Sequence, residues 1–249
     1  SRQATISRVD PVAAHREHVL AVNVSQLVVV SSYLAPRMKW GLIDRYLVLA
    51  KQQNIEATII LNKQDLLHGS KKKSFIQECN QMEELYKSLG YRVISMQANA
   101  TQDKTQKDML VNVFKDQISV ISGHSGVGKS SIVNLLDPEI VQDVELEEIR
   151  VKGRHTTTYA SFIKLGIGGY LIDTPGIRSF VIRKDDPSAL SMGFVDIAQY
   201  SDQCFYRSCQ HINEPDCQVK KAVNDGLIHP NRYKSYCGIL LGTTGRDQQ

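Results

Sequence analysis

The stretch Gly123–Ser131, with the sequence GHSGVGKSS, restricts the fold of this chain more than any other part of it. It contains the pattern Gly-x4-Gly-Lys-Ser of a phosphate-binding loop, in which backbone N–H groups turn inward around phosphate oxygens. The apolar stretch ISVIS precedes the loop and SSIVNLL follows it. These flanks predict a strand before the loop and a helix after it, whose N-terminus favours an anion. A glycine-rich turn that arose by chance is the alternative, and the flanks disfavour it.

Every residue of this loop is a candidate for contact with a nucleotide. We expect the Lys129 ammonium to reach the β- and γ-phosphates and the Ser130 hydroxyl to ligate Mg²⁺. The candidates are Gly123, His124, Ser125, Gly126, Val127, Gly128, Lys129, Ser130 and Ser131. The loop lies near the middle of the 249 residues. In a nucleotide-binding domain of ordinary order it follows the first strand, so the sequence in front of it needs an explanation.

A second motif, Asn62-Lys63-Gln64-Asp65, follows the apolar stretch TIIL. The Asp65 carboxylate can accept hydrogen bonds from N1–H and the 2-amino group of guanine, and adenine presents neither in that arrangement. We expect Asn62 to support the other edge of the base, and Lys63 to lie over the ring or to brace the phosphate loop. Alone, these four letters fit a solvated turn. Together with a phosphate loop they predict a preference for GTP over ATP.

Two further motifs supply switch chemistry. Asp173-Thr174-Pro175-Gly176 ends the stretch GYLI, where Asp173 can hold Mg²⁺ through a water and the Gly176 N–H can bond the γ-phosphate. Upstream, GRHTTT offers Thr156 or Thr157 as the threonine that closes on Mg²⁺. A threonine triplet also occurs for β-propensity alone. Which threonine of residues 156–158 is the ligand stays open.

These four motifs form the set that a GTP-hydrolysing domain needs, in a changed order. The guanine motif comes first, followed by the phosphate loop, the threonines and the Asp-Thr-Pro-Gly motif. A β-sheet domain can be permuted when its old termini are joined and a new break opens in a surface loop. Here the break falls just after residue 176. The sequence before the phosphate loop is then the guanine-reading half of the same sheet.

The pattern of apolar residues predicts an α/β fold: a circularly permuted phosphate-loop GTPase domain with a mostly parallel sheet and helices on both faces. The first 24 residues are polar and short on periodicity. Strands are expected within 25–32, 56–62, 91–95 and 118–123, and a hairpin pair within 159–165 and 169–176. Helices are expected at 42–54, from 74 to the helix-ending Gly90, and at 130–136. After about residue 179 the pattern changes to short helical pieces and a closing helix, 231–241. Its shared face is expected to carry Tyr233, Tyr236, Cys237, Leu240 and Leu241.

Three cysteines and a histidine lie close together in this last part. The spacing Cys204-x4-Cys209-x-His211-x5-Cys217 supplies the ligands of a closed, structural Zn²⁺ site, one per chain. Such a site would hold together a unit that is too small to have a core of its own. A disulfide or free thiols are the alternatives. Cys79 and Cys237 fall on apolar helix faces and are interpreted as small buried hydrophobes.

The motifs GHSGVGKSS, GRHTTT, DTPGIRSF and CFYRSCQHINEPDC together resemble the small-ribosomal-subunit biogenesis GTPase family, RsgA, also called YjeQ. The resemblance covers residues 20 to 240. It implies a GTPase that acts late in small-subunit maturation, contacts rRNA and is stimulated by the ribosomal particle. It also implies an N-terminal oligonucleotide-binding barrel, a permuted GTPase domain and a C-terminal zinc domain. In the guanine-side loop, Gln97-Ala98 stands where the family has a Ser-Ala-like pair, so only Ala98 carries over.

The chain departs from the family plan at its front, because about 20 residues are too few for a five-stranded barrel. We therefore expect a residual N-terminal segment at 1–24, the GTPase domain at 25–180 and a zinc-binding helical domain at 181–249.

Hydrolysis also requires a group that orients the attacking water. Where Ras-like proteins place a water-orienting Gln, this sequence has Ile177, which cannot orient water, so intrinsic hydrolysis should be slow. His155 is the candidate substitute, in agreement with the family resemblance, and acts with Lys129, Thr156 and Thr157. The alternatives for His155 are a solvated switch residue or an RNA contact.

Charge and composition set the remaining expectations. A net charge of +4 permits contact with rRNA without demonstrating it. No run approaches 18 apolar residues and no leader is visible, so we expect no membrane contact. We expect a monomer that binds GTP and GDP in a bacterial cytoplasm, with an organelle that has bacterial-type ribosomes as the other source. Three other functions stay open: a non-catalytic GTP-binding scaffold on the ribosome, an ATP-dependent or metabolic enzyme, and an RNA-binding zinc module.

Overall fold

A computed structural model describes residues 5–9, 17–70, 72–99, 103–137, 161–173, 182 and 186–243. At 5–9, 17–22, 161 and 173 it describes the backbone alone. The chain forms two compact units. The first comprises Ser1–Met38 and Ile55–Phe180, and the second Lys39–Asn54 and Val181–Gln249. The predicted domain boundaries stay a prediction.

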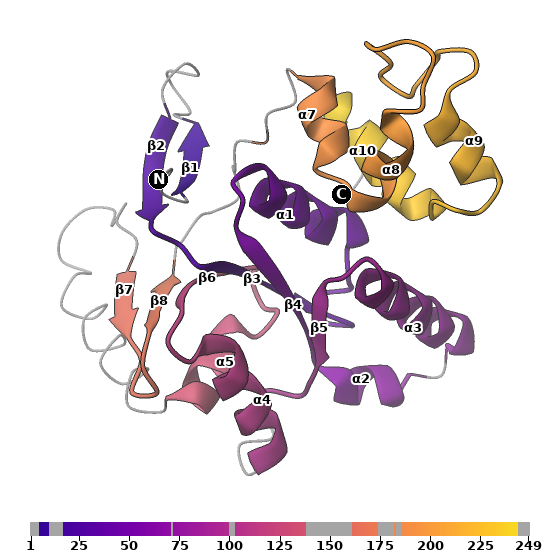
Figure 1. Cartoon of the computed structure of the whole chain (residues 1–249). Coiled ribbons are helices and arrows are strands. Elements are labelled where there is room, and N and C mark those ends of the chain that lie inside the picture. The colour runs from indigo at the N-terminus through magenta and orange to yellow at the C-terminus, as the bar shows by residue number, and fades with distance from the viewer. Residues whose placement is uncertain are drawn as a thin grey trace. The chain divides into compact units, whose positions relative to one another are not determined.

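The first unit is built on a six-stranded sheet with the order β5-β4-β3-β6-β8-β7 (Figure 1). Neighbouring strands are parallel except β7 and β8, which pair antiparallel. The strands are β3 Gln26–Ser32, β4 Glu56–Asn62, β5 Arg92–Ser95, β6 Ile118–Ser122, β7 Ser161–Lys164 and β8 Tyr170–Asp173. The mostly parallel sheet and the hairpin pair are confirmed.

The central strands are apolar on both faces. Residues Leu27 to Val30 of β3 and Ile59 to Leu61 of β4 are at most 1% exposed. Burying each such side chain contributes about 1.5–3 kcal/mol relative to exposure. Strands of this kind form parallel sheets that are covered on both sides.

Four described helices accompany this sheet: α2 Gln64–His68, α3 Lys73–Ser88, α4 Lys104–Phe114 and α5 Lys129–Leu136. The helices predicted to end before Gly90 and to follow the phosphate loop are confirmed as α3 and α5. Gly90 adopts a left-handed φ of 87°, as a helix-ending glycine does. The sequence analysis did not predict α4, although Leu110, Val113 and Phe114 of this helix are buried in the core beside the sheet.

The strand order places the nucleotide motifs at one edge of the sheet. On one side of β3 the sheet continues with β4 and then β5, and on the other side with β6, β8 and β7. Ligands of open parallel sheets bind at the carboxyl ends of the strands where the order reverses, which here is between β3 and β6. The phosphate loop follows β6, and Asn62 ends β4.

Two strands lie where the sequence analysis expected little regular structure. β1 Thr5–Val9 and β2 Glu17–Val22 form a separate antiparallel pair (Figure 1). The segments TISRV and EHVLAV are too short for an alternating pattern to stand out from their polar surroundings.

The second unit contains helix α1, although α1 lies between β3 and β4 in the sequence. The helices of this unit are α1 Trp40–Gln52, α7 Pro187–Met192, α8 Val195–Ser201, α9 Gln218–Asn224 and α10 Pro230–Leu240. They share a core to which Val48, Phe194, Ile197 and Tyr236 contribute. The expectation of a unit without a core of its own was therefore wrong, because α1 contributes Val48 to a core that these helices share.

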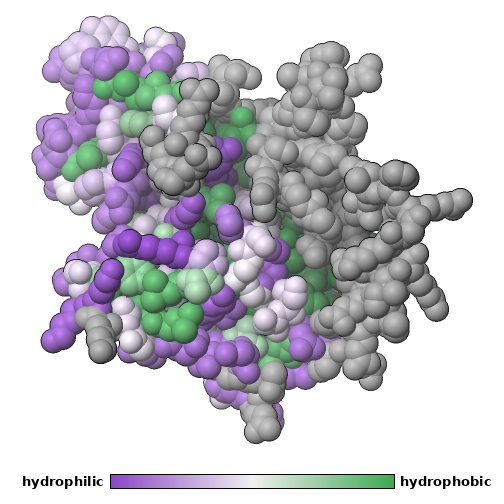
Figure 2. Space-filling view, turned by 180° about the vertical axis from the view of Figure 1, so that it is seen from behind, coloured by the Kyte–Doolittle hydropathy of each residue, from purple (hydrophilic) through white to green (hydrophobic). Residues whose placement is uncertain are grey.

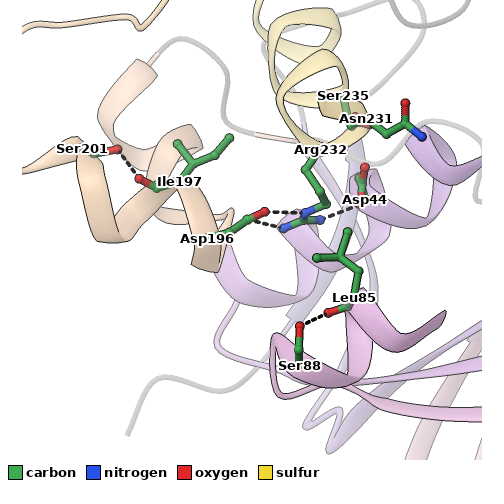
Figure 3. A network of polar contacts seen from close by, with 9 residues as sticks. All are labelled: Asp44, Leu85, Ser88, Asp196, Ile197, Ser201, Asn231, Arg232 and Ser235. Atoms are coloured by element: carbon green, nitrogen blue, oxygen red, sulfur yellow. Dashed lines mark hydrogen bonds and ion pairs between the residues drawn. The ribbon is translucent and has the colours of Figure 1, made fainter. Parts of the chain in front are cut away.

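A buried arginine connects three helices of the second unit (Figure 3). Arg232 of α10 donates from Nε and Nη2 to the two carboxylate oxygens of Asp196, at 3.0 and 2.8 Å. Its Nη1 lies 2.6 Å from Oδ1 of Asp44, on α1. The guanidinium also lies 4.7 Å from the ring centroid of Phe194. Side chains of Arg232 and Asp44 are fully buried, so the charges are compensated by each other rather than by water.

This arginine changes the face that α10 buries. The predicted face was wrong at Leu241, which is 61% exposed. The residues of α10 that are buried are Arg232, Ser235, Tyr236 and Ile239. Apolar periodicity misplaced the face because a paired arginine occupies a core position.

The described surface has a mixed character. On the face drawn in Figure 2, apolar areas are small and lie among hydrophilic ones. Among the described residues, no helix combines the length and the apolar character that crossing a membrane requires.

We predict that Arg232→Met lowers the free energy of unfolding by about 3–5 kcal/mol, because it leaves two buried carboxylates without their cation. Chemical denaturation followed by circular dichroism measures the change. Lys234→Met is the matched control, since Lys234 is an exposed cation on the same helix. It should change stability by less than about 0.5 kcal/mol. Equal losses in the two variants would contradict a special role for Arg232.

Candidate nucleotide-binding site and metal centre

The phosphate loop packs closely against its neighbours at two glycines. A Cβ on Gly123 would lie 2.1 Å from the carbonyl oxygen of Val30, at the heart of β3. A Cβ on Gly128 would lie 2.2 Å from Nδ2 of Asn62, and Gly128 has a left-handed φ of 98°. Both distances are below any real contact, so only glycine permits the loop to lie against β3 and Asn62.

The other residues of the phosphate loop either hold the loop in place or are exposed to solvent. Val127 is 2% exposed and fixes the loop in the core. The Lys129 Nζ lies 3.0 Å from the Gly123 carbonyl and 3.3 Å from that of His124, so the ammonium is held over the loop. His124, Ser125, Gly126, Ser130 and Ser131 are exposed. The loop therefore offers polar groups to a ligand, while their contacts with a nucleotide stay predictions.

Asn62 joins three parts of the site. Its Nδ2 donates to the Val127 carbonyl at 2.9 Å, and its Oδ1 accepts from the N–H groups of Ala98 at 2.9 Å and Lys63 at 2.8 Å. The side chain is buried, at 2% exposure. Asn62 thus fixes the phosphate loop against the loop of Gln97 and Ala98, here called the base loop (residues 96–98). Its predicted support of the base stays a prediction.

Lys63 contacts the phosphate loop, one of the two positions considered for it. Its Nζ donates to the Gly126 carbonyl at 2.7 Å and to the Ala35 carbonyl. The segment of Ala35 follows β3, so this ammonium ties the loop after β3 to the phosphate loop.

One carboxylate oxygen of Asp65 has no hydrogen-bond donor within the described part of the chain. Its Oδ1 is buried and has no hydrogen-bond partner among the described residues. A buried acceptor without a partner costs about 1–3 kcal/mol, and a bound ligand with a donor would remove that cost. Guanine presents two such donors, N1–H and the 2-amino group. The carboxylate is thus of the chemical type that the predicted guanine site requires.

The switch residues are described only in part. The backbone of Asp173 ends β8 and pairs with Ile121 of β6, which brings it to the edge that carries the phosphate loop. Its side chain lies outside the described residues. The same holds for His155, Thr156, Thr157, Gly176 and Ile177. The predicted Mg²⁺ set of Ser130, Thr156 and Asp173 therefore stays a prediction.

The four predicted metal ligands do come together. The ligand atoms of Cys204, Cys209, His211 and Cys217 all lie within 4.8 Å of one another. Nδ1 of His211 is 3.6 Å from the Cys204 sulfur and 3.4 Å from that of Cys217, and these sulfurs are 3.9 Å apart. A tetrahedral Zn²⁺, with Zn–S of about 2.3 Å and Zn–N of about 2.0 Å, spaces its ligands roughly 3.5–3.8 Å apart. The geometry fits such an ion. The cysteines are free, so the disulfide alternative is not supported.

Burial shifts the pKa values of three of these ligand groups toward their neutral forms. Burial raises the pKa of the Cys209 thiol to about 12, and it also raises that of Cys217 and lowers that of His211. Neutral thiols are weak ligands, whereas a bound cation favours the thiolates. Binding of a cation at this site would therefore be accompanied by the release of protons from the thiols.

Residues around the cluster that were not predicted from the sequence hold the ligand loop in place. The Glu214 carboxylate accepts from the N–H groups of Gln210, Ile212 and Asn213 at 2.8, 2.9 and 3.1 Å. Its side chain therefore closes the loop that carries His211.

Helix α10 holds the same loop from another element. The Tyr233 hydroxyl donates to the His211 carbonyl at 2.6 Å, and the Tyr236 hydroxyl donates to the Gln210 carbonyl at 3.0 Å. Nε2 of His211, the ring nitrogen that does not face the sulfurs, lies 3.2 Å from Ser201 Oγ, and this contact orients the imidazole. The one sequence signal for these contacts was Glu214, which lies between the ligands His211 and Cys217.

We predict that Gly128→Ala weakens nucleotide binding at least about tenfold, which corresponds to 1.4 kcal/mol. The added methyl would displace the Asn62 amide, and calorimetric titration with GTP measures the loss. Gly90→Ala is the matched control, because Gly90 has a similar φ of 87° with nothing within 4 Å of the added carbon. It should cost stability without changing affinity. Unchanged affinity in Gly128→Ala would contradict the contact.

We predict that Cys217→Ser lowers the zinc content of the purified chain well below one ion per molecule, because a serine hydroxyl is a much poorer zinc ligand than a thiolate. Elemental analysis after dialysis measures the content. Cys237→Ser, in the same unit but outside the cluster, should retain the full content. Equal zinc in both variants would show that the cluster is not the metal site.

Comparisons with known proteins agree with this geometry. The sequence model described as RsgA GTPase matches residues 1–183. The small ribosomal subunit biogenesis GTPase RsgA of Actinobacillus succinogenes is 36% identical over 223 residues, which cover 89% of this chain and 62% of that protein. The protein of the same name from Thermotoga petrophila is 34% identical over 237 residues, covering 93% of this chain and 77% of that protein. The chain thus spans about three fifths of the length of the first relatives it matches.

Two solved structures share the fold. YjeQ from Thermotoga maritima superposes with a TM-score of 0.71 at 29% identity, covering 96% of this chain and 82% of that one. YloQ, a circularly permuted GTPase, gives a TM-score of 0.69 at 26% identity, covering 99% and 81%. The fold is therefore the circularly permuted GTPase fold that the motif order predicted. With its sheet order, its phosphate loop and this match over most of its length, the chain belongs to the RsgA GTPase family.

Proposed function

We propose that this protein is a GTP hydrolase that acts in the maturation of the small ribosomal subunit and is stimulated by that particle. The observation that carries the proposal is the arrangement around Asn62. One buried amide holds the phosphate loop against the base loop, beside an Asp65 oxygen that is buried and lacks a donor. A guanine nucleotide would satisfy that oxygen. The related proteins are named for small-subunit biogenesis, which supports the choice of partner.

The proposal divides the work among named residues. Gly123–Ser131 would bind the phosphates, Asp65 would read the base, and Ala98 would lie beside it. Ser130, Thr156 and Asp173 would hold Mg²⁺, which supplies charge neutralisation at the phosphates when it is bound. His155, with Lys129 and Thr157, is the candidate catalytic group, and it would act on the attacking water. A non-catalytic scaffold is the alternative that the hydrolysis experiment below addresses.

The cofactor of the second unit is proposed to be Zn²⁺ in a structural role. The cluster has three sulfurs and one nitrogen, which favour zinc over oxygen-seeking cations such as Mg²⁺. All four positions of a tetrahedral ion would be filled by the chain, so no position would remain for a substrate.

We further propose a monomer in the bacterial cytoplasm that contacts rRNA. The bacterial sources of the relatives support the compartment. The net charge of +4 is compatible with an RNA partner without identifying its site.

The decisive experiment measures hydrolysis of GTP and XTP with isolated small or large ribosomal subunits. Wild-type protein should hydrolyse GTP slowly alone and at least about tenfold faster with small subunits, but not with large ones. In Asp65→Asn the stimulated activity should move from GTP to XTP, because the amide can donate to the 2-oxo group that xanthine carries.

The control is Asp108→Asn, which removes an exposed carboxylate from α4 and should retain the preference for GTP. GTP binding without stimulated hydrolysis would favour the scaffold. An unchanged nucleotide preference in Asp65→Asn would overturn the assignment of the base-reading residue.

A further inference from the structure

The base loop is also held by a residue outside the nucleotide motifs. The N–H of Gln97 donates to Oε1 of Gln106, on α4, at 2.8 Å. The Gln106 amide in turn donates to Oδ2 of Asp103 at 2.9 Å. Oδ1 of Asp103 caps the helix by accepting from the N–H groups of Thr105 and Gln106, at 3.0 and 3.3 Å. Gln106 is thus locked in a single orientation, with its carbonyl toward the base loop.

Along the chain, Gln97 lies between two groups that contact the guanine motif. On one side, the Met96 carbonyl accepts from the N–H of Gln64 at 3.0 Å. On the other, the N–H of Ala98 donates to Oδ1 of Asn62 at 2.9 Å. Gln64 directly precedes Asp65, so the position of the Asp65 carboxylate depends on where residues 96–98 lie.

The strand before the base loop is fixed separately. The hydroxyls of Tyr33 and Ser95 and the Glu83 carboxylate lie within 2.7–2.8 Å of one another. Ser95 ends β5, so this group sets where the base loop begins. Gln106 then holds the middle of the loop, since no other side chain accepts the Gln97 N–H among the described contacts.

We propose that Gln106 is a positioning residue for base recognition, which acts through Gln97 and the base loop to place the Asp65 carboxylate against the guanine 2-amino group. The proposal rests on the proposed GTP binding. Asp103 supports it by holding the Gln106 amide, and these hydrogen bonds also lower the pKa of the Asp103 carboxyl.

A comparison of GTP with ITP tests the role. ITP lacks the 2-amino group but keeps the triphosphate and N1–H, so the ratio of the two affinities reports how well Asp65 meets that group. Gln106→Ala should reduce this ratio about five- to tenfold, the effect of about one net hydrogen bond. Affinities are measured by calorimetric titration of the full 249-residue chain.

Three further variants distinguish the positioning role of Gln106 from a general effect of substitutions in α4 on the fold. Lys107→Ala, at the next and exposed position of α4, should keep the wild-type ratio. Gln106→Glu should lower the ratio, because its second oxygen would face the Asp103 carboxylate. Adding Asp103→Asn to Gln106→Glu should restore the ratio, since the new amide again donates while the glutamate still accepts from Gln97.

The outcomes divide clearly. An unchanged ratio in Gln106→Ala, or an equal loss of GTP and ITP affinity, would overturn the positioning role, as would failure of the double variant to restore the ratio. If the wild-type chain binds neither nucleotide, the proposed function itself is wrong. If the wild-type chain prefers GTP and Gln106→Ala keeps that preference, only the role of Gln106 fails.

Discussion

The edge of the sheet that carries the phosphate loop depends on one buried side-chain amide. Asn62 uses its donor on the phosphate loop and its acceptor on the base loop, so two loops that are far apart in the sequence are fixed against the end of one strand. An unpaired amide at such a depth would be costly, which makes the arrangement nearly all-or-none. The absence of a side chain at Gly128 is the condition for this contact. Circular permutation leaves the contact intact because it changes the order of the segments and not their places in the sheet.

The second unit is stabilised by a different kind of interaction. Its helices are short, and the charges of Arg232, Asp196 and Asp44 lie inside the core. The loop that carries His211 is held by hydrogen bonds from the tyrosines of the same helix that carries Arg232. One face of α10 therefore serves both the ion network and the cluster, which explains why it does not have the simple apolar pattern of a core helix.

The sequence predicted those features in which a few residues at fixed spacing require a particular geometry. The sheet, its hairpin and the approach of Cys204, Cys209, His211 and Cys217 are of this kind. Features that depend on a partner far along the chain could not be predicted. Arg232 looks like a surface residue until Asp44 and Asp196 are known to face it, and Gln106 looks like an ordinary helix residue until the base loop is placed beside it. The strands β1 and β2 and the helix α4 have short or weak apolar patterns, so local periodicity gave little signal.

Helix α1 has a consequence for how the chain reaches its native state. Asp44 and Arg232 are separated by 188 positions in the sequence. During synthesis from the N-terminus, α1 leaves the ribosome long before the helix that neutralises its buried carboxylate. Until then Asp44 must remain in contact with water, so the second unit is among the last parts of the chain to fold. Its C-terminal segment also cannot fold in the same way without α1. In evolution, the segment that carries Cys204 to Cys217 could be exchanged between proteins only together with helix α1, which is encoded far upstream of it.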